Sequence, residues 1–181
     1  VQRKFFGTLY NTYSFFSLYA NIDNFTYSED RIPVENRPEI DRWVLSELNS
    51  TIEAVDAAFA DYEPTRAARL MSHFVTENLS NWYVRLCRRR FWKGDYTEDK
   101  IAAYQTLFEC LFAMSKMMAP IAPFYADQLY RDLNSVAVLE DAESVHISTF
   151  PEVEKSAIDK ELQERMSLAQ RATSLVLSIR K

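Results

Sequence analysis

The sequence predicts an all-α fold, in which helices pack as a bundle around one core. Apolar residues recur at the three- and four-residue spacing of a helix face in six segments of the chain. Only two of the 181 residues are glycine, about 1% against a usual share of roughly 7%, and tight turns and phosphate-binding loops depend on glycine. Sheet-rich folds and nucleotide-binding loop folds are therefore disfavoured, and the 48% hydrophobic content is sufficient for a substantial core.

The first helix is expected from about Gln2 to Ile22. One face at helical spacing consists of Phe5, Leu9, Thr12, Phe16 and Ala20. Seven aromatic rings lie between Phe5 and Tyr19, and a helix that is apolar around most of its circumference is usually buried on more than one side. The excess predicts a second packing surface, against a domain outside this chain. Asp23 to Arg37, which contains Pro33, is expected to be a connecting loop.

The second and third helices are the longest expected elements. The second begins with Asn36 as its N-cap and Pro38 in its first turn. Its amphipathic stripe consists of Val44, Leu48, Thr51, Ile52, Val55 and Phe59. The third helix begins near Pro64 and runs for about thirty residues to a stop at Lys93-Gly94.

The remaining part of the chain is expected to form three more helices. Thr97 caps the fourth, which ends at Ala119-Pro120, and a shorter fifth runs from Pro123 to Leu133. The last helix runs from about Ile158 to the terminus. Its apolar positions are Leu162, Met166, Ala169, Ala172, Leu175, Val176 and Ile179.

An irregular, acidic connection is expected before the last helix, over residues 134–154, with a brief extended piece at Val145 to Ile147. The chain starts with Val rather than Met, and the last helical pattern continues to Lys181 without a stop signal. Residues 1–181 are therefore expected to be a single helical domain excised from a longer polypeptide.

The stretch from Asn81 to Asp95 is the main candidate for a functional site, because it carries five cations and four aromatic rings in a chain of net charge −5. Arginine forks pair with phosphate and stack on bases, so the stretch indicates a local contact with RNA. The expected phosphate contacts are Arg85, Arg88, Arg89, Arg90 and Lys93, and the expected stacking residue is Trp92. Trp82 and Leu86 continue the apolar stripe, so Trp82 is predicted to be a core residue. The alternative is a solvated helix face whose arginines pair with acidic residues of the chain.

Other chemistry is poorly supported by the sequence. No serine or cysteine stands at a recognisable spacing from a histidine and an acid, and there is no phosphate-loop motif, so no catalytic residue is assigned. Glu143 and His146 form a lone Glu-x-x-His, whereas a bundle-core metal site needs a pair, so no metal ligand is assigned. Cys87 and Cys110 fit a helical core in a reducing cytosol, and no membrane span is expected. Two rival classes stay open: a helical module that binds a protein partner, and an enzyme with a metal in the bundle core.

Several ordered motifs resemble one known family. They are Leu9-Tyr-Asn-Thr-Tyr-Ser-Phe-Phe16, Asp41-Arg-Trp-Val-Leu-Ser-Glu-Leu-Asn49, Asn81-Trp-Tyr-Val-Arg-Leu-Cys-Arg-Arg-Arg-Phe-Trp-Lys-Gly94, Met118-Ala-Pro-Ile-Ala-Pro-Phe124, Ser144-Val-His-Ile-Ser-Thr-Phe-Pro151 and Glu164-Arg-Met-Ser-Leu-Ala-Gln170. Together they are similar to the helical anticodon-binding domain of isoleucyl-tRNA synthetases, which belong to class Ia of the aminoacyl-tRNA synthetases. The valyl enzymes share a weaker form of the motifs, so the equivalent valyl domain is the alternative.

The resemblance implies a cytoplasmic ligase that joins isoleucine to its tRNA using ATP, in which this bundle holds the anticodon stem-loop. ATP and zinc are implied only for the full-length enzyme, and no cofactor is implied for this chain. Signatures like His-Ile-Gly-His and Lys-Met-Ser-Lys-Ser are absent from the sequence, as are the editing domain and the cysteine-rich zinc module. The implied partners are the isoleucine tRNA and the catalytic domain of the same polypeptide, which would pack against the first helix.

Overall fold

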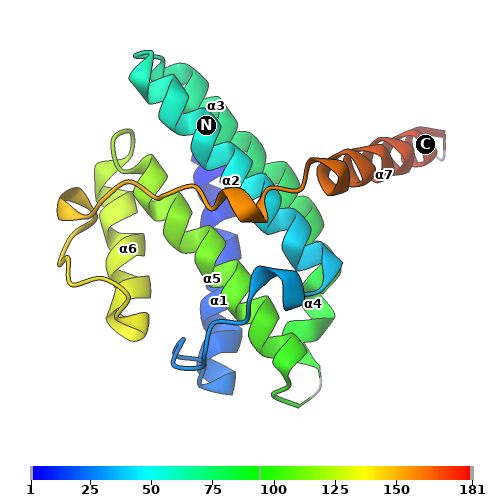
Figure 1. The fold of residues 1–181 in the computed structure, drawn as a ribbon, viewed down its shortest axis with the longest axis horizontal. Helices are drawn as coiled ribbons and strands as arrows, with labels where there is room; N and C mark the ends of the chain where they lie inside the picture. Colours follow the sequence, from blue (N-terminus) through cyan, green and yellow to red (C-terminus); the bar gives the residue numbers. More distant parts are fainter. Residues whose placement is uncertain (1, 94, 180–181) are drawn as a thin grey trace.

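The computed structural model describes residues 2–93 and 95–179, which form helices joined by irregular segments, with no strand in those ranges (Figure 1). The predicted all-α fold is confirmed. The α-helices are α1 (Gly7–Asp23), α2 (Glu39–Ala60), α3 (Pro64–His73), α4 (Arg85–Trp92), α5 (Glu98–Met118), α6 (Pro123–Ala137) and α7 (Lys160–Ile179). Two π-helical segments, Gln2–Phe6 and Phe74–Val84, and three short 3-10 turns, Val34–Asn36, Val145–Ile147 and Lys155–Ala157, complete the elements.

Helix α5 is the centre of the bundle and contacts α1, α2, α3, α4 and α6 (Figure 1). Most of its residues are buried, as expected for a helix surrounded by others. The predicted core face of the first helix is confirmed at Leu9, Thr12, Phe16 and Ala20, which are all buried. Phe5, the first residue of that face, is half-buried and packs against the core. Phe25 stacks on Tyr104 of α5, with ring centroids 4.9 Å apart, and this contact holds the loop after α1 against the core.

The predicted third helix is confirmed as one continuous helical run from Pro64 to Trp92, and Gly94 of its expected stop lies outside the described residues. Its middle, however, is the π-helix Phe74–Val84, which has more residues per turn than an α-helix and therefore rotates the phase of the residues that follow. The prediction that Trp82 and Leu86 continue the core stripe is wrong. Trp82 is half-buried and Leu86 is 57% exposed. The core positions belong to Tyr83, Cys87 and Phe91.

Three local predictions also differ from the structure. Asn36 ends a 3-10 turn instead of capping the next helix, whose N-cap is Pro38. The piece from Val145 to Ile147 is a 3-10 turn rather than extended, because the Ser144 side chain accepts a hydrogen bond from the backbone N–H of His146. Thr97 does occupy the N-cap of α5, but its side chain makes no capping hydrogen bond.

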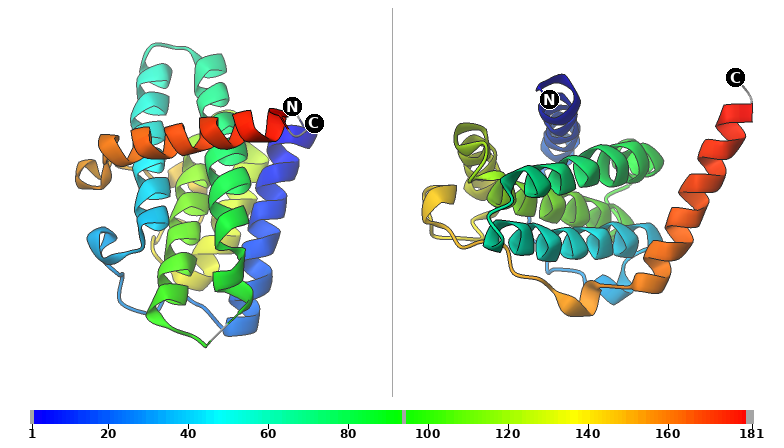
Figure 2. Two further views of the ribbon diagram at one scale, coloured as in Figure 1. Left: turned by 90° about the vertical axis from the view of Figure 1, so that its right-hand side faces the viewer. Right: turned by 90° about the horizontal axis from the view of Figure 1, so that it is seen from above.

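The irregular connection predicted over residues 134–154 begins later, because α6 continues past Leu133 to Ala137. Residues 138–159 form a strap that crosses α5 and α2 before α7 begins (Figure 1). Helix α7 then projects away from the bundle, as the two further views in Figure 2 show. Only Leu162 near its start is buried, and Gln163 binds the Ser46 hydroxyl of α2 at 2.8 Å. Met166, the next residue of the predicted apolar face, is half-buried and packs against the core. From Ala169 onward the predicted face is exposed, and Ile179 is 84% exposed. No described helix is long and apolar enough to cross a membrane.

Candidate nucleic-acid interface

The outer face of α4 carries most of the basic cluster. We use the name outer face for Arg85, Arg88, Arg89, Trp92 and Lys93, all of which are exposed. Among the described residues, the side chains of its four cations make no hydrogen bond and no ion pair. Trp92 is 48% exposed. Because the charges are solvated and not neutralised within the fold, they are available to an anionic ligand.

Arg90 points the other way. Its Nη1 and Nη2 donate to Oδ1 and Oδ2 of Asp41 at 2.6 and 2.8 Å, a bidentate ion pair. Its Nε donates to Oδ2 of Asp99 at 3.0 Å, and Nη2 also donates to the Asp99 backbone carbonyl at 2.7 Å. In the part of the chain that the structure describes, Arg90 is therefore the one of the six predicted RNA contacts whose side chain forms hydrogen bonds and ion pairs within the protein.

Asp41 is the buried half of this pair, with a side chain that is 0% exposed. Tyr83 donates its hydroxyl to Asp41 Oδ1 at 2.9 Å, so the carboxylate is satisfied from two sides. Burial and then the negative charge of Asp41 raise the pKa of Tyr83 well above its usual value, which keeps the phenol protonated as a donor. Burial also raises the pKa of Cys87 to about 11, so this thiol is not a nucleophile at neutral pH. We call Asp41, Tyr83, Arg90 and Asp99 the inner network.

An aromatic contact that sequence reasoning missed joins α1 to the outer face. The ring of Tyr19 lies 6.5 Å from that of Trp92, centroid to centroid. Phe15 supports both helices, because its ring lies 5.0 Å from Tyr19 and 5.1 Å from Phe91. The excess of rings on the first helix was visible in the sequence, but which of them would meet α4 was not.

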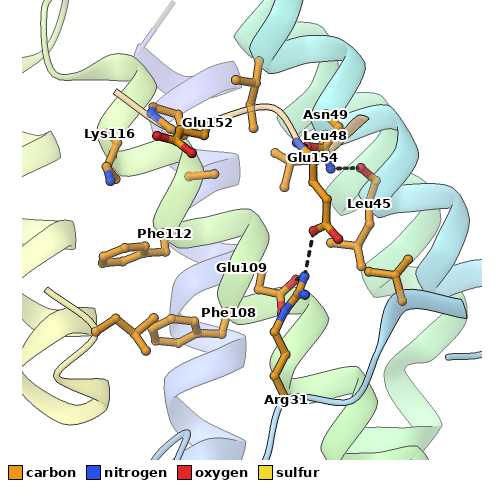
Figure 3. A pocket seen from close by; sticks show the side chains of 15 residues that line it. Arg31, Leu45, Leu48, Asn49, Phe108, Glu109, Phe112, Lys116, Glu152 and Glu154 are labelled. Atoms are coloured by element: carbon orange, nitrogen blue, oxygen red, sulfur yellow. Dashed lines mark hydrogen bonds and ion pairs between the residues drawn. The ribbon is translucent and has the colours of Figure 1, made fainter. Parts of the chain in front are cut away.

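A second polar cluster lies beside a cavity of about 260 Å³ between α2, α5 and the strap (Figure 3). Glu109 accepts hydrogen bonds from Arg37 at 2.8 Å and from Arg31 at 3.0 Å, and Arg31 also reaches Glu154 of the strap at 3.0 Å. Burial alone would raise the pKa of Glu109, but Arg37 and Arg31 hold it below its ordinary value. The charges neutralise one another, so the cluster ties the strap to the bundle and presents no acid/base pair.

No arrangement for metal binding occurs in the described ranges, since no three His, Cys, Asp or Glu side chains there come together as ligands would. His73 and His146, the two histidines considered from the sequence, are both exposed. His146 lies in the 3-10 turn of the strap, whereas His73 lies at the end of α3. The two histidines are therefore on separate elements.

Comparison with known proteins gives one consistent result. Residues 41–181 match the family described as the anticodon-binding domain of tRNA ligase. The whole chain is 58% identical to part of the isoleucine–tRNA ligase of Bacteroides thetaiotaomicron and 60% identical to part of that of Porphyromonas gingivalis. A more distant match, to the isoleucine–tRNA ligase of Clostridium novyi, is 43% identical over 99% of the chain. The chain spans only about 16% of the length of the first two relatives and 17% of the third.

Proposed function

The chain belongs to the family of anticodon-binding domains of tRNA ligases, and from this we propose that it binds the anticodon stem-loop of an isoleucine tRNA as part of an isoleucine–tRNA ligase. The complete ligase would join isoleucine to its tRNA at the expense of ATP, in the cytoplasm. Family membership does not favour the alternative of a helical protein-interaction module without RNA binding. The relatives named above are isoleucine ligases, which supports isoleucine over valine.

The observation that carries the proposal is the outer face of α4, whose cations form no ion pair within residues 2–93 and 95–179. The side chains of Arg85, Arg88, Arg89 and Lys93 would bind phosphate oxygens and orient the stem-loop. An unstacked anticodon base would lie against the exposed indole of Trp92, with Tyr19 supporting it from α1. The net charge of −5 argues against sequence-blind binding over a large basic surface, so the proposed contact with RNA is local.

The outward surface of α1 is proposed to pack against the catalytic domain of the same polypeptide. Tyr10, Leu18 and Ile22 are exposed there, although they are large hydrophobic residues. A largely apolar cleft of about 450 Å³ lies beside the π-helical segment that precedes α1, lined by Phe5, Phe6 and Met118 among others, and offers a second apolar contact. In this arrangement recognition of the anticodon takes place in the bundle, and the chemistry takes place in the body that covers α1.

A titration with tRNA tests the proposal. The purified chain is mixed with a transcript of an isoleucine tRNA, and with the same transcript carrying a changed anticodon, at low and at moderate salt. Preferential binding of the unchanged anticodon, weakened by salt, is the expected result. Equal binding of both transcripts would remove the anticodon from the proposal, and absence of binding at low salt would mean that this chain does not recognise tRNA by itself.

A further inference from the structure

We infer that Asp41 and Arg90 are positioning residues, which do not touch RNA but hold α4 in the orientation that presents the outer face. The inference rests on the proposed function. It assigns to Arg90 a role different from that of the arginines beside it in the sequence, and it assigns a role in RNA binding to an acid that is fully buried.

The first step is the saturation of the Arg90 guanidinium. A guanidinium has five N–H donors. Nε and Nη2 both donate to Asp99, Nη1 and Nη2 both donate to Asp41, and Nη1 also lies 3.7 Å from the Cys87 sulfur. A phosphate at Arg90 would have to displace Asp41 or Asp99, and displacing Asp41 would leave a buried carboxylate without its cation. Arg90 is therefore poorly suited to contact the RNA backbone directly.

The second step is the place of this pair in the fold. Asp41 lies in the first turn of α2 and Asp99 in the first turn of α5, whereas Arg90 lies in the last turn of α4. One side chain thus ties the end of α4 to the beginnings of two other helices. A planar fork bound on two edges restricts rotation of α4 about its axis more than a point charge does. Phe91 is also buried there, but an apolar contact lacks this directional constraint.

The third step is the relation between Arg90 and the outer face. Arg88 and Arg89 precede Arg90 directly, and Lys93 follows it by three residues, with its backbone N–H bonded to the Arg89 carbonyl at 3.0 Å. Successive residues of a helix differ in direction by about 100°. Fixing the direction of Arg90 therefore fixes the directions in which Arg88 and Arg89 leave the helix, and so the spacing of these two cations along a phosphate backbone. Lys93 has an extended backbone and lies at the end of the helix, where its N–H bond to Arg89 holds it.

This arrangement makes a prediction opposite in sign to simple electrostatics. Removing the negative charge of Asp41 should, by long-range attraction alone, favour an anionic ligand. If Asp41 positions α4, its removal should instead weaken RNA binding, even though the carboxylate cannot reach the RNA.

The experiment compares Asp41→Asn, Arg90→Lys, Arg90→Gln and the double variant Asp41→Asn/Arg90→Gln, with Arg88→Gln as the matched variant from the outer face. Affinity for an isoleucine tRNA transcript is measured at several salt concentrations, at a temperature where circular dichroism finds each variant folded. We expect the affinity of Asp41→Asn and of both Arg90 variants for the tRNA to fall about tenfold. The affinity of the double variant should fall no further, because each substitution breaks the same ion pair. Arg88→Gln should lower the slope of log affinity against log salt by about one.

Each outcome decides between the two roles of Arg90. Unchanged or tighter binding by Asp41→Asn, together with weaker binding by Arg90→Gln, would overturn the inference and make Arg90 a direct phosphate contact. Full affinity of Arg90→Lys would do the same, since lysine keeps the charge and loses the fork. If Asp41→Asn does not fold, Asp99→Asn replaces it, because this carboxylate is largely exposed and only one arm of the network is lost. Failure of the unsubstituted chain to bind would mean that this chain does not recognise tRNA by itself, and the positioning role, which rests on that recognition, would fall with it.

Discussion

Arginine has different surroundings on the two faces of α4: it is exposed on the outer face and ion-paired on the face toward the bundle. Arg89 and Arg90 are neighbours in the sequence, yet Arg90 has five contacts with Asp41, Asp99 and Cys87, whereas Arg89 has none through its side chain among the described residues. The difference depends on Asp41, which is 49 positions away in the sequence. A run of arginines is thus no uniform ligand site, because its members divide according to which acids the fold brings to them.

The energetic consequences of the two faces are opposite. A buried ion pair adds little net stability compared with an apolar pair of the same size, but loss of one partner leaves a buried charge uncompensated. Exposed cations contribute little to stability, although Arg89, in the last turn of α4, is favoured there by the helix dipole. Substitutions on the inner network should therefore affect folding first, and substitutions on the outer face should affect binding first.

The largest effect is expected from Asp41→Ala. The substitution leaves Arg90 half-buried without its main partner and removes the nearer acceptor of the Tyr83 hydroxyl, which keeps only the Ala103 carbonyl at 3.4 Å. We expect a loss of about 3–5 kcal/mol in the free energy of unfolding, measured by urea denaturation. As a control, Asp41→Leu combined with Arg90→Met replaces the pair by apolar side chains and should lie closer to the unsubstituted protein. A loss below about 1 kcal/mol for Asp41→Ala would contradict the distinction between the two faces.

Charge reversal of the outer face comes next. Arg88→Glu combined with Arg89→Glu should weaken binding of an isoleucine tRNA by about a hundredfold, or about 2.7 kcal/mol, because two phosphate contacts become repulsive. The free energy of unfolding should change by less than about 1 kcal/mol, since neither side chain has a polar partner among the residues that the structure describes. Affinity by titration and stability by thermal melting check the two parts. Unchanged affinity would remove these arginines from the proposed RNA site, and a large loss of stability would show that the outer face is structural after all.

Trp82→Ala tests the boundary between the faces. If Trp82 were fully buried, its replacement by alanine would lower the free energy of unfolding by about 3–5 kcal/mol. Because the π-helix turns it partly outward, we expect a smaller loss of about 2 kcal/mol in a urea denaturation experiment. Phe91→Ala is the matched variant, since Phe91 is buried and lies in the run that follows the π-helix, and it should show the full loss. Equal losses for the two variants would place Trp82 in the core.

Features that depend on residues close together in the sequence could be predicted, whereas features that depend on residues far apart in the sequence could not. The helices, including the whole run from Pro64 to Trp92, were predictable because apolar spacing is a local property. The π-helix changes the spacing by its own winding, so the phase assigned to Trp82 and Leu86 failed. The spacing along α7 indicated an apolar face, but spacing does not say whether another element covers that face. The pairing of Arg90 with Asp41 could not be predicted from local spacing either, because the two residues are 49 positions apart and meet only once the fold has formed.

The smallest effect is expected from a change of pH that protonates Glu109. It tests whether an ion pair outside α4 also stabilises the fold. Glu109 binds Arg37 and Arg31, and its pKa in the folded protein lies below the ordinary 4.5. A depressed pKa means that the unfolded chain binds the proton more readily, so this stabilisation is fully present above about pH 4.5 and is lost as the pH falls through the folded-state pKa.

Because other carboxylates titrate in the same range, the useful measurement is a difference. The stability of the unsubstituted protein minus that of Glu109→Gln, from urea denaturation between pH 7 and pH 3, should shrink as the pH falls, since glutamine keeps the shape and carries no charge to lose. The same subtraction for Arg88→Gln should stay flat, because arginine does not titrate there and Arg88 has no internal acid among the described residues. A flat difference for Glu109 would mean that its arginines contribute no net stabilisation of the charged form, and the contrast between paired and unpaired charges would then be confined to α4.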